Sequence, residues 1–202
     1  MNQYIEKQIK VTYGKTFEEM SDVEKESITE ISIFAENFRG QSTDIKIPDL
    51  ASFPNIQRCL IKGFALSDED INFLIGLKSL KGVQFSNCDF SQATSLNSDL
   101  ELIVLDGCEG VSNQFLRGNT SLRILKIVNQ EYFDVSSLGE CSSLEQVYLQ
   151  KTRLTNLINL RRLPGLKFVN LDGSSFNFFV LLQLRRVVKV EYQKDFQPGV
   201  DR

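Results

Sequence analysis

An apolar pattern that returns every 22 residues constrains this chain more than any other feature of its sequence. The segments that carry it are LELIVLDGC, LRILKIVNQ, LEQVYLQKT and LKFVNLDGS. Their inner apolar position advances in equal steps through Ile103, Leu125, Val147 and Val169. A fixed period of this length is typical of a solenoid, in which stacked repeats bury one continuous core. The sequence therefore predicts a solenoid and favours a function in surface binding.

Each repeat divides into a strand and a return segment. The alternating residues V-Y-L or V-N-L predict a short strand with one buried face. Apolar residues three apart follow, as in Leu157, Leu160 and Leu163, and this spacing suits a 3₁₀ segment or a tight helical turn. Two longer returns predict helices, over residues 16–28 and over residues 66–77, the second with Ser67 as its N-cap.

Looser repeats extend the pattern towards the N-terminus, so that we expect about nine repeats in all. Their inner apolar pairs are Val83 and Phe85, Cys59 and Ile61, Ile45 and Ile47, Ile31 and Ile33, and Ile9 and Val11.

The chain is interpreted as one domain over its 202 residues. Irregular N-terminal repeats or a cap occupy 1–50, central repeats 51–175, a C-terminal cap 176–192 and a mobile tail 193–202. The cap is expected because a terminal repeat must close the open end of the core, and its last strand should contain Val188 and Val190. An amphipathic helix for a partner is the alternative interpretation of this apolar segment.

The segments LELIVLDGCEGV, LEQVYLQKTRL and LKFVNLDGSSF resemble the leucine-rich repeat pattern L-x-x-L-x-L-x-x-N/C-x-L. The 22-residue period resembles the subclass found in bacterial internalins and in phosphatase-regulating repeat proteins. The resemblance implies an α/β solenoid, right-handed and curved, with a parallel concave β-sheet and short helical or 3₁₀ segments on the convex side. The family usually places Asn in the turn after the strand, whereas this chain has other residues there, so we expect a less regular solenoid. Those residues are Cys88, Cys108, Gln130, Thr152 and Ser174.

Charge and composition narrow the classes of partner and chemistry. The net charge of -3 argues against nucleic acid or an anionic membrane as the main partner, since both reward a concentrated positive field. The chain has no histidine, the commonest general base and metal ligand. Its N-terminus lacks the apolar core of a signal peptide. The four cysteines occupy apolar repeat positions, which favours a reducing, cytoplasmic location over a disulfide framework.

No arrangement of residues predicts catalysis, a cofactor or a metal. Asp106 and Asp172 are each followed by glycine, which is mainly a turn signal, and they lie three repeats apart, too far for paired-carboxylate chemistry. Cys88 and Cys108 occupy equivalent turns and are interpreted as core residues. The acidic residues after Ser67 are interpreted as a helix start, since they lack calcium-loop spacing.

The repeat pattern also predicts which strand residues face solvent on the concave sheet. Because alternate residues of a strand point to opposite faces, the residues between the inner positions point outward and form rows across the sheet. Their apolar members form a contiguous patch, which commonly marks a binding site, with Tyr148 and Phe168 as anchors. The predicted binding residues are Leu102, Val104, Asp106, Ile124, Lys126, Val128, Tyr148, Phe168, Asn170 and Asp172.

These observations favour a monomeric, non-enzymatic module that binds another protein on its concave face. One alternative is an inhibitor or immunity-type protein that neutralises one enzyme, such as a toxin, steered by its acidic charge. The other is a recognition domain of a larger bacterial virulence or adhesion protein.

Overall fold

The protein is represented by a computed structural model that describes residues 3–35, 47–96, 99–112 and 114–193. One parallel sheet runs through the molecule in the order β1-β2-β4-β6-β7-β9-β11-β12, so that each repeat places its strand beside the strand of the previous repeat. The strands are β1 Glu30–Phe34, β2 Arg58–Lys62, β4 Gly82–Ser86, β6 Leu102–Asp106, β7 Ile124–Val128, β9 Gln146–Gln150, β11 Phe168–Asn170 and β12 Lys189–Glu191.

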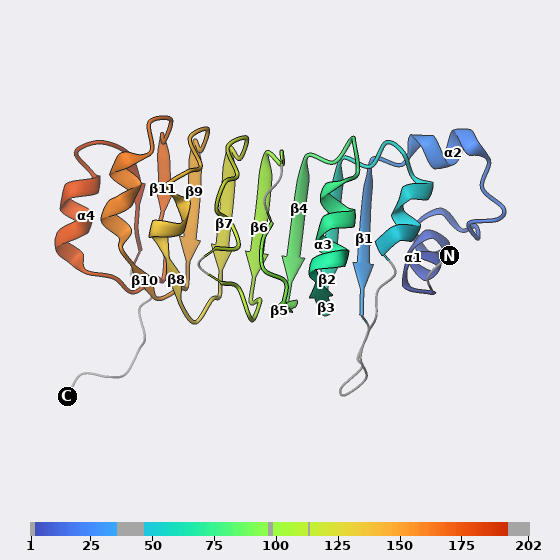
Figure 1. Cartoon of the computed structure of the whole chain (residues 1–202), viewed down its shortest axis with the longest axis horizontal. Coiled ribbons are helices and arrows are strands. Elements are labelled where there is room, and N and C mark those ends of the chain that lie inside the picture. Colours follow the sequence, from blue (N-terminus) through green and yellow to red (C-terminus); the bar gives the residue numbers. More distant parts are fainter. Residues whose placement is uncertain (1–2, 36–46, 97–98, 113, 194–202) are drawn as a thin grey trace.

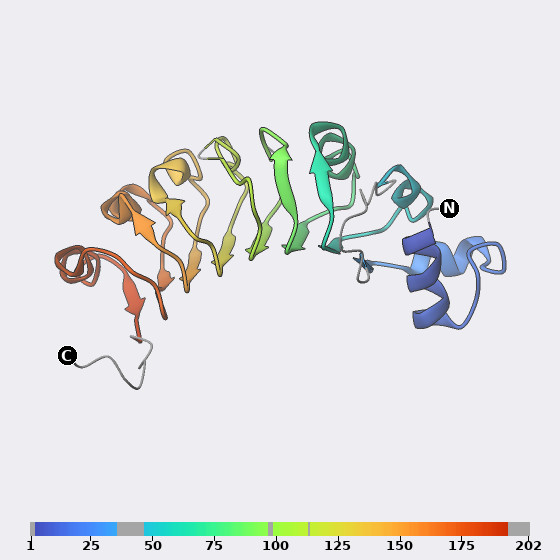
Figure 2. The same ribbon diagram turned by 90° about the horizontal axis from the view of Figure 1, so that it is seen from below.

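The molecule is an arc, with this main sheet on its inner, concave side and the return segments on its outer, convex side (Figures 1 and 2). The returns contain α3, three 3₁₀ helices and two small two-stranded sheets, β3–β5 and β8–β10. The predicted solenoid, its parallel concave sheet and its short convex helices are therefore confirmed. The return elements are η1 Ile47–Ser52, β3 Ala65–Ser67, α3 Asp68–Ile75, β5 Asp89–Gln92, β8 Phe133–Asp134, η2 Val135–Leu138, β10 Leu154–Thr155 and η3 Leu157–Arg162.

The core lies between the main sheet and the returns. The inner positions Ile103, Leu125, Val147 and Val169 are fully buried, whereas the outward residues of β6, β7 and β9 are half-buried. The apolar residues that alternate along each strand in the sequence thus face the core, and the residues between them face the surface. Truncating such a buried side chain to alanine typically costs about 2–5 kcal/mol, so each repeat depends on its neighbours for stability.

At the N-terminus the structure differs from the prediction of a strand containing Ile9 and Val11. Residues Gln3–Tyr13 form helix α1, which lies at the end of the sheet next to β1 (Figure 1). Ile5 and Ile9, four residues apart, are buried on one helix face, while Val11 is 73% exposed. The prediction was wrong because it relied on Ile9 and Val11, whose spacing of two also fits a strand. The residues that pack are Ile5 and Ile9, whose spacing of four places them on one face of a helix.

The repeat predicted at Ile45 and Ile47 is also wrong. Ile47 begins the 3₁₀ helix η1, Ile45 lies outside the described residues, and β1 pairs directly with β2. This segment is therefore the return of the β1 repeat rather than a repeat with its own strand. Its step of 14 residues from the preceding unit is too short for a strand, a turn and a return.

The predicted helix over residues 16–28 is shorter in the structure. Helix α2 covers Asp22–Ser27, because Ser21 and Glu24 form a capping box that starts the helix there. The same device was predicted at Ser67, and the structure confirms it: the Ser67 hydroxyl accepts from the backbone N–H of Asp70, and the Asp70 carboxylate accepts from the backbone N–H of Ser67.

The C-terminal end of the sheet is closed by helix α4, Phe178–Leu184, and by β12. Val190 pairs in register with Val169 of β11, as expected for a last strand. α4 buries Leu181 and Leu184 and leaves Phe178 and Phe179 exposed. Residues 194–202 of the predicted mobile tail lie outside the described residues.

The residue directly after β2, β4, β6, β7 or β9 has a left-handed backbone, as does Gly173 at the equivalent position in the turn beyond β11. Five of these six positions hold Gly or Asn, the residues that tolerate a positive φ best. Lys151 is the exception, with a φ of 50°. This explains the Asp-Gly pairs at 106–107 and 172–173 as turn residues. The left-handed residues are Gly63, Asn87, Gly107, Asn129, Lys151 and Gly173.

We predict that Lys151→Asn stabilises the protein by about 1 kcal/mol, because a lysine in the left-handed region carries backbone strain of about that size. Urea unfolding at constant m-value measures the change. Lys78→Asn is the matched control, since Lys78 is also exposed and lies outside the left-handed region. An equal effect of both substitutions would show that charge, not backbone conformation, determines the change.

Gly110 should tolerate a side chain much less well than Gly14, although both have a φ of +70°. A Cβ on Gly110 would lie 2.4 Å from the backbone nitrogen of Ser91, whereas a Cβ on Gly14 meets no atom within 4 Å. We expect Gly14→Ala to cost about 1 kcal/mol through backbone strain alone. Gly110→Ala should cost at least about 2 kcal/mol more, because the backbone of the adjacent repeat must move. Equal losses in thermal unfolding would contradict the contact with Ser91.

Candidate functional site

The outward side chains of the main sheet form three rows across neighbouring strands, as the sequence predicted. The first row is Glu30, Arg58, Gly82, Leu102, Ile124, Gln146, Phe168 and Lys189. The second row is Ser32, Leu60, Gln84, Val104, Lys126, Tyr148, Asn170 and Glu191. The third row is Phe34, Lys62, Ser86, Asp106, Val128 and Gln150.

The apolar members of these rows gather over β6, β7, β9 and β11, where they form what we call the concave patch. The patch consists of Leu102, Val104, Ile124, Val128, Tyr148 and Phe168. All six are half-buried although they face the open side of the sheet, because neighbours within and between rows cover one another. The patch is thus closely packed rather than fully exposed, and its role in binding stays a prediction.

Two aromatic rings and two lysines form a stack at one end of the patch. The Tyr148 and Phe168 ring centroids lie 5.4 Å apart at an interplanar angle of 54°. Lys126 Nζ lies 4.9 Å from the Tyr148 centroid, and Lys189 Nζ lies 5.3 Å from the Phe168 centroid. The Tyr148 hydroxyl donates to Gln146 Oε1 at 3.0 Å. Each ring therefore has a lysine cation within cation–π distance of its centroid.

The polar residues predicted for binding have contacts within the protein. Asn170 is buried, and its Oδ1 accepts from Gln150 Nε2 at 2.9 Å and from the Asp172 backbone N–H at 3.0 Å. Asp106 Oδ1 accepts from Asn129 Nδ2 at 2.7 Å. Asp172 Oδ2 accepts from Asn170 Nδ2 at 2.8 Å. These contacts hold the turns at the C-terminal ends of the strands, so the side chains of Asp106, Asn170 and Asp172 have structural roles whether or not a partner contacts them.

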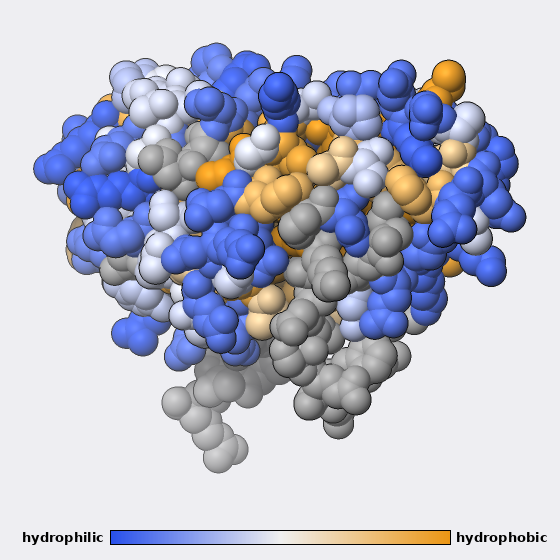
Figure 3. Space-filling model, turned by 45° about the vertical axis from the view of Figure 1, so that its right-hand side comes forward, coloured by the Kyte–Doolittle hydropathy of each residue, from blue (hydrophilic) through white to orange (hydrophobic). Residues whose placement is uncertain are grey.

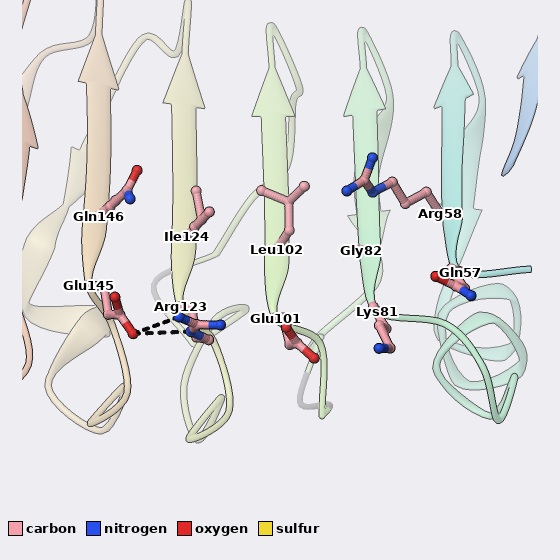
Figure 4. Close-up of a pocket in the computed structure, with 10 residues that line it drawn as sticks. All are labelled: Gln57, Arg58, Lys81, Gly82, Glu101, Leu102, Arg123, Ile124, Glu145 and Gln146. Carbon is pink, nitrogen blue, oxygen red and sulfur yellow. Dashed lines mark hydrogen bonds and ion pairs between the residues drawn. The ribbon is translucent and has the colours of Figure 1, made fainter. Parts of the chain in front are cut away.

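A shallow pocket of about 230 Å³ lies on the same face, near the N-terminal ends of β2, β4, β6, β7 and β9 (Figure 4). Gly82 contributes to it because it places no side chain in the first row between Arg58 and Leu102. A Cβ on Gly82 would lie 3.2 Å from the Cβ of Leu102. The pocket was not predicted from the sequence, although a glycine among the large residues of this row was a signal for it. The lining residues are Gln57, Arg58, Lys81, Gly82, Glu101, Leu102, Arg123, Ile124, Glu145 and Gln146.

Charged residues that directly precede the strands form one rim of the pocket. Lys81, Glu101, Arg123 and Glu145 alternate in sign along this rim. Glu145 accepts from Arg123 Nε at 3.1 Å and from Lys167 Nζ at 2.8 Å, so that it forms an ion pair with both side chains. The hydrogen bonds from Lys167 and Arg123 lower the pKa of the Glu145 carboxyl, which is therefore ionised near neutral pH. The pocket accordingly has an apolar floor at Leu102 and Ile124 and a rim of both signs.

The side of the molecule seen in Figure 3 is mostly hydrophilic, with apolar residues gathered near its centre. None of the helices in the described parts of the chain has the length and apolarity needed to span a bilayer. Within those parts, no group of three or more Cys, Asp and Glu side chains is arranged to hold a metal ion.

The residues that replace Asn in the turns still connect neighbouring repeats. The backbone N–H of Gln130 donates to Thr152 Oγ1 at 3.2 Å, and that of Thr152 donates to Ser174 Oγ at 3.0 Å. The Cys88 and Cys108 sulfurs donate to backbone carbonyls of the preceding strands at 3.4 and 3.5 Å. Hydroxyl and thiol groups thus provide a ladder of contacts in place of the asparagines of the family pattern. This ladder was not predicted from the sequence.

All four cysteines are free and buried, as expected of core residues. Burial raises the pKa of Cys59 to about 12 and that of Cys141 to about 11. The neighbouring Cys88 thiol and burial raise the pKa of Cys108, whereas the Cys108 thiol lowers that of Cys88. Cys88 is only 1% exposed, so the folded protein shields this thiol from reagents.

The fold is similar to those of two solved structures from Listeria monocytogenes str. 4b F2365. Internalin C2 matches with a TM-score of 0.57 and 18% identity over 95% of this chain and 93% of that chain. The internalin inlF matches with a TM-score of 0.59 and 14% identity over 96% of this chain, which spans 64% of that protein. No family model and no curated protein matches the sequence. The chain has the leucine-rich-repeat fold that its sequence pattern predicted.

We predict that none of the four thiols of the native protein reacts with a bulky disulfide reagent at mildly alkaline pH, whereas all four react in denaturant. Burial and the raised pKa of Cys59, Cys108 and Cys141 together keep the reactive thiolate out of reach. Absorbance of the released thiol counts the reacting groups. Rapid modification of the native protein would show that the turns open more easily than these contacts indicate.

Proposed function

We propose that this chain is a non-enzymatic protein-interaction module that binds a protein partner on the concave face of its main sheet. The observation that carries the proposal is the concave patch, where large apolar side chains meet on the open side of a sheet. Contiguous apolar surface of this kind usually marks an interaction site. Aromatic side chains such as Tyr148 and Phe168 contribute strongly when a partner covers them.

The scaffold supports this function because it is already ordered. Each strand is hydrogen-bonded to its neighbours in one continuous parallel sheet. A partner that binds here immobilises few additional side chains, so less of its interaction energy is offset by lost entropy. The pocket beside Gly82 lies on the same face and gives the partner a second point of contact.

The inhibitor or immunity-type alternative gains little support from the concave face. The net charge of -3 on the whole chain would steer it towards a basic enzyme. The outward charged residues of the main sheet, however, are of both signs and are not predominantly acidic. They are Glu30, Arg58, Lys62, Asp106, Lys126, Lys189 and Glu191.

The alternative of a recognition domain within a larger protein is supported by one comparison. The matched internalin inlF is longer than this chain, which spans 64% of it. We further propose a reducing, cytoplasmic location, because all four cysteines are free and buried in the core.

We predict that Tyr148→Glu combined with Phe168→Glu abolishes binding of the natural partner while the protein stays folded. Any apolar partner would desolvate the two introduced carboxylates, which opposes binding. A loss of about 2 kcal/mol of binding free energy per anchor residue weakens the complex about 30-fold for each substitution. Affinity purification from the native cell with quantitative mass spectrometry identifies proteins held by the wild type, and calorimetry with the identified partner measures the loss.

The matched control is Tyr132→Glu combined with Phe179→Glu, which places the same charges on exposed aromatic residues away from the main sheet. This control should retain the partner. Circular dichroism checks that both double variants are folded. Unchanged binding by the Tyr148/Phe168 variant would refute the concave face as the site.

A further inference from the structure

Lys126 is a charged residue at a position of the sheet where its neighbours are apolar or aromatic. It lies in the second row at the centre of the concave patch, with Val104 and Tyr148 beside it on the neighbouring strands. Ile124 and Val128 precede and follow it on the same face of β7. The side chain is half-buried among these four apolar or aromatic neighbours.

The positive charge of Lys126 has no carboxylate partner among the described residues. Its one recorded interaction is with the Tyr148 ring, 4.9 Å from Nζ. Asp106 lies diagonally across the sheet in the third row, and its Oδ1 accepts from Asn129 instead. Lys189, at the other end of the stack, differs in this respect because it forms an ion pair with Glu191 at 3.1 Å.

A partner that covers the patch would remove water from an ammonium group that has no counter-ion. This desolvation opposes binding unless the partner brings a negative charge to the same place. The Lys126 cation also lies over the Tyr148 ring, so a second cation brought to the same place would be repelled.

We propose that the concave patch recognises a protein segment in which an Asp or Glu carboxylate, flanked by apolar side chains, pairs with Lys126. The proposal rests on the proposed function and specifies the chemistry of its partner. The carboxylate lies against Lys126, while the flanking apolar side chains contact Ile124, Val128, Tyr148 and Phe168. A patch with one cation among apolar side chains suits a single carboxylate better than a polyanion such as nucleic acid, because a polyanion binds best to many clustered cations.

The first test is stability, which needs no knowledge of the partner. Lys126→Met keeps the length of the side chain and removes a charge that is unpaired and partly desolvated. We expect a higher midpoint in urea unfolding, because residues kept for binding are often unfavourable for folding. Lys78→Met, which removes an exposed lysine outside the concave face, should leave the midpoint unchanged. A lower midpoint for Lys126→Met would give the lysine a structural role and overturn the proposal.

The second test is the choice of ligand from a library of random displayed peptides. The library is selected on the wild-type protein, and each enriched peptide is then measured by fluorescence anisotropy with the wild type, Lys126→Met, Lys78→Met and the double variant Tyr148→Glu/Phe168→Glu. We expect enriched peptides to contain Asp or Glu beside an apolar residue and to bind Lys126→Met at least tenfold more weakly. Replacing the peptide carboxylate by the corresponding amide should cause the same loss, and Lys78→Met should cause none.

The outcomes separate the two proposals. Enriched peptides that lose binding in the double variant but are neutral or basic, or that bind Lys126→Met as well as wild type, would overturn the carboxylate proposal and leave the concave site intact. Enriched peptides indifferent to the double variant, or no enrichment at all, would contradict the concave site and with it the role of Lys126.

Discussion

Burial of alternate strand residues between neighbouring repeats is the constraint on which the rest of this structure depends. Inner residues such as Ile103, Leu125 and Val147 are completely buried only because the next repeat lies at the same register. No single repeat could shield them, so the strands must stack in parallel and in sequence order. The concave rows follow directly, because the residues between the buried ones point to the opposite face of the sheet.

The turns that make this stacking possible determine much of the polar chemistry. A left-handed residue lies in the turn after each central strand, and the hydroxyl and thiol groups just beyond it connect one repeat to the next. Asp106 and Asn170 contribute to the same region through hydrogen bonds to neighbouring turns and strands. Most polar groups near the strand ends are therefore satisfied within the solenoid. By contrast, no carboxylate in the described part of the chain pairs with Lys126.

Much of this architecture was predictable where the repeat was regular. From β4 onward the inner residues, the outward rows and the last strand agree with the sequence pattern. The errors lie near the N-terminus, where α1 replaces the strand expected at Ile9 and η1 replaces the one expected at Ile47. Terminal segments cap the core instead of repeating it, so the spacing of two apolar residues there does not identify the element that buries them.

The sequence by itself determined the solenoid, the residues of each strand that face the core and the membership of the concave patch. These properties follow from a period that any folded form of the chain must satisfy to bury its apolar residues. Only the tertiary structure decided that the patch is half-buried, that Tyr148 and Phe168 are stacked between Lys126 and Lys189, and that a pocket lies beside Gly82. These features depend on side chains from different repeats, more than 20 residues apart in the chain for Lys126 and Tyr148, whose distances the packing of the strands sets.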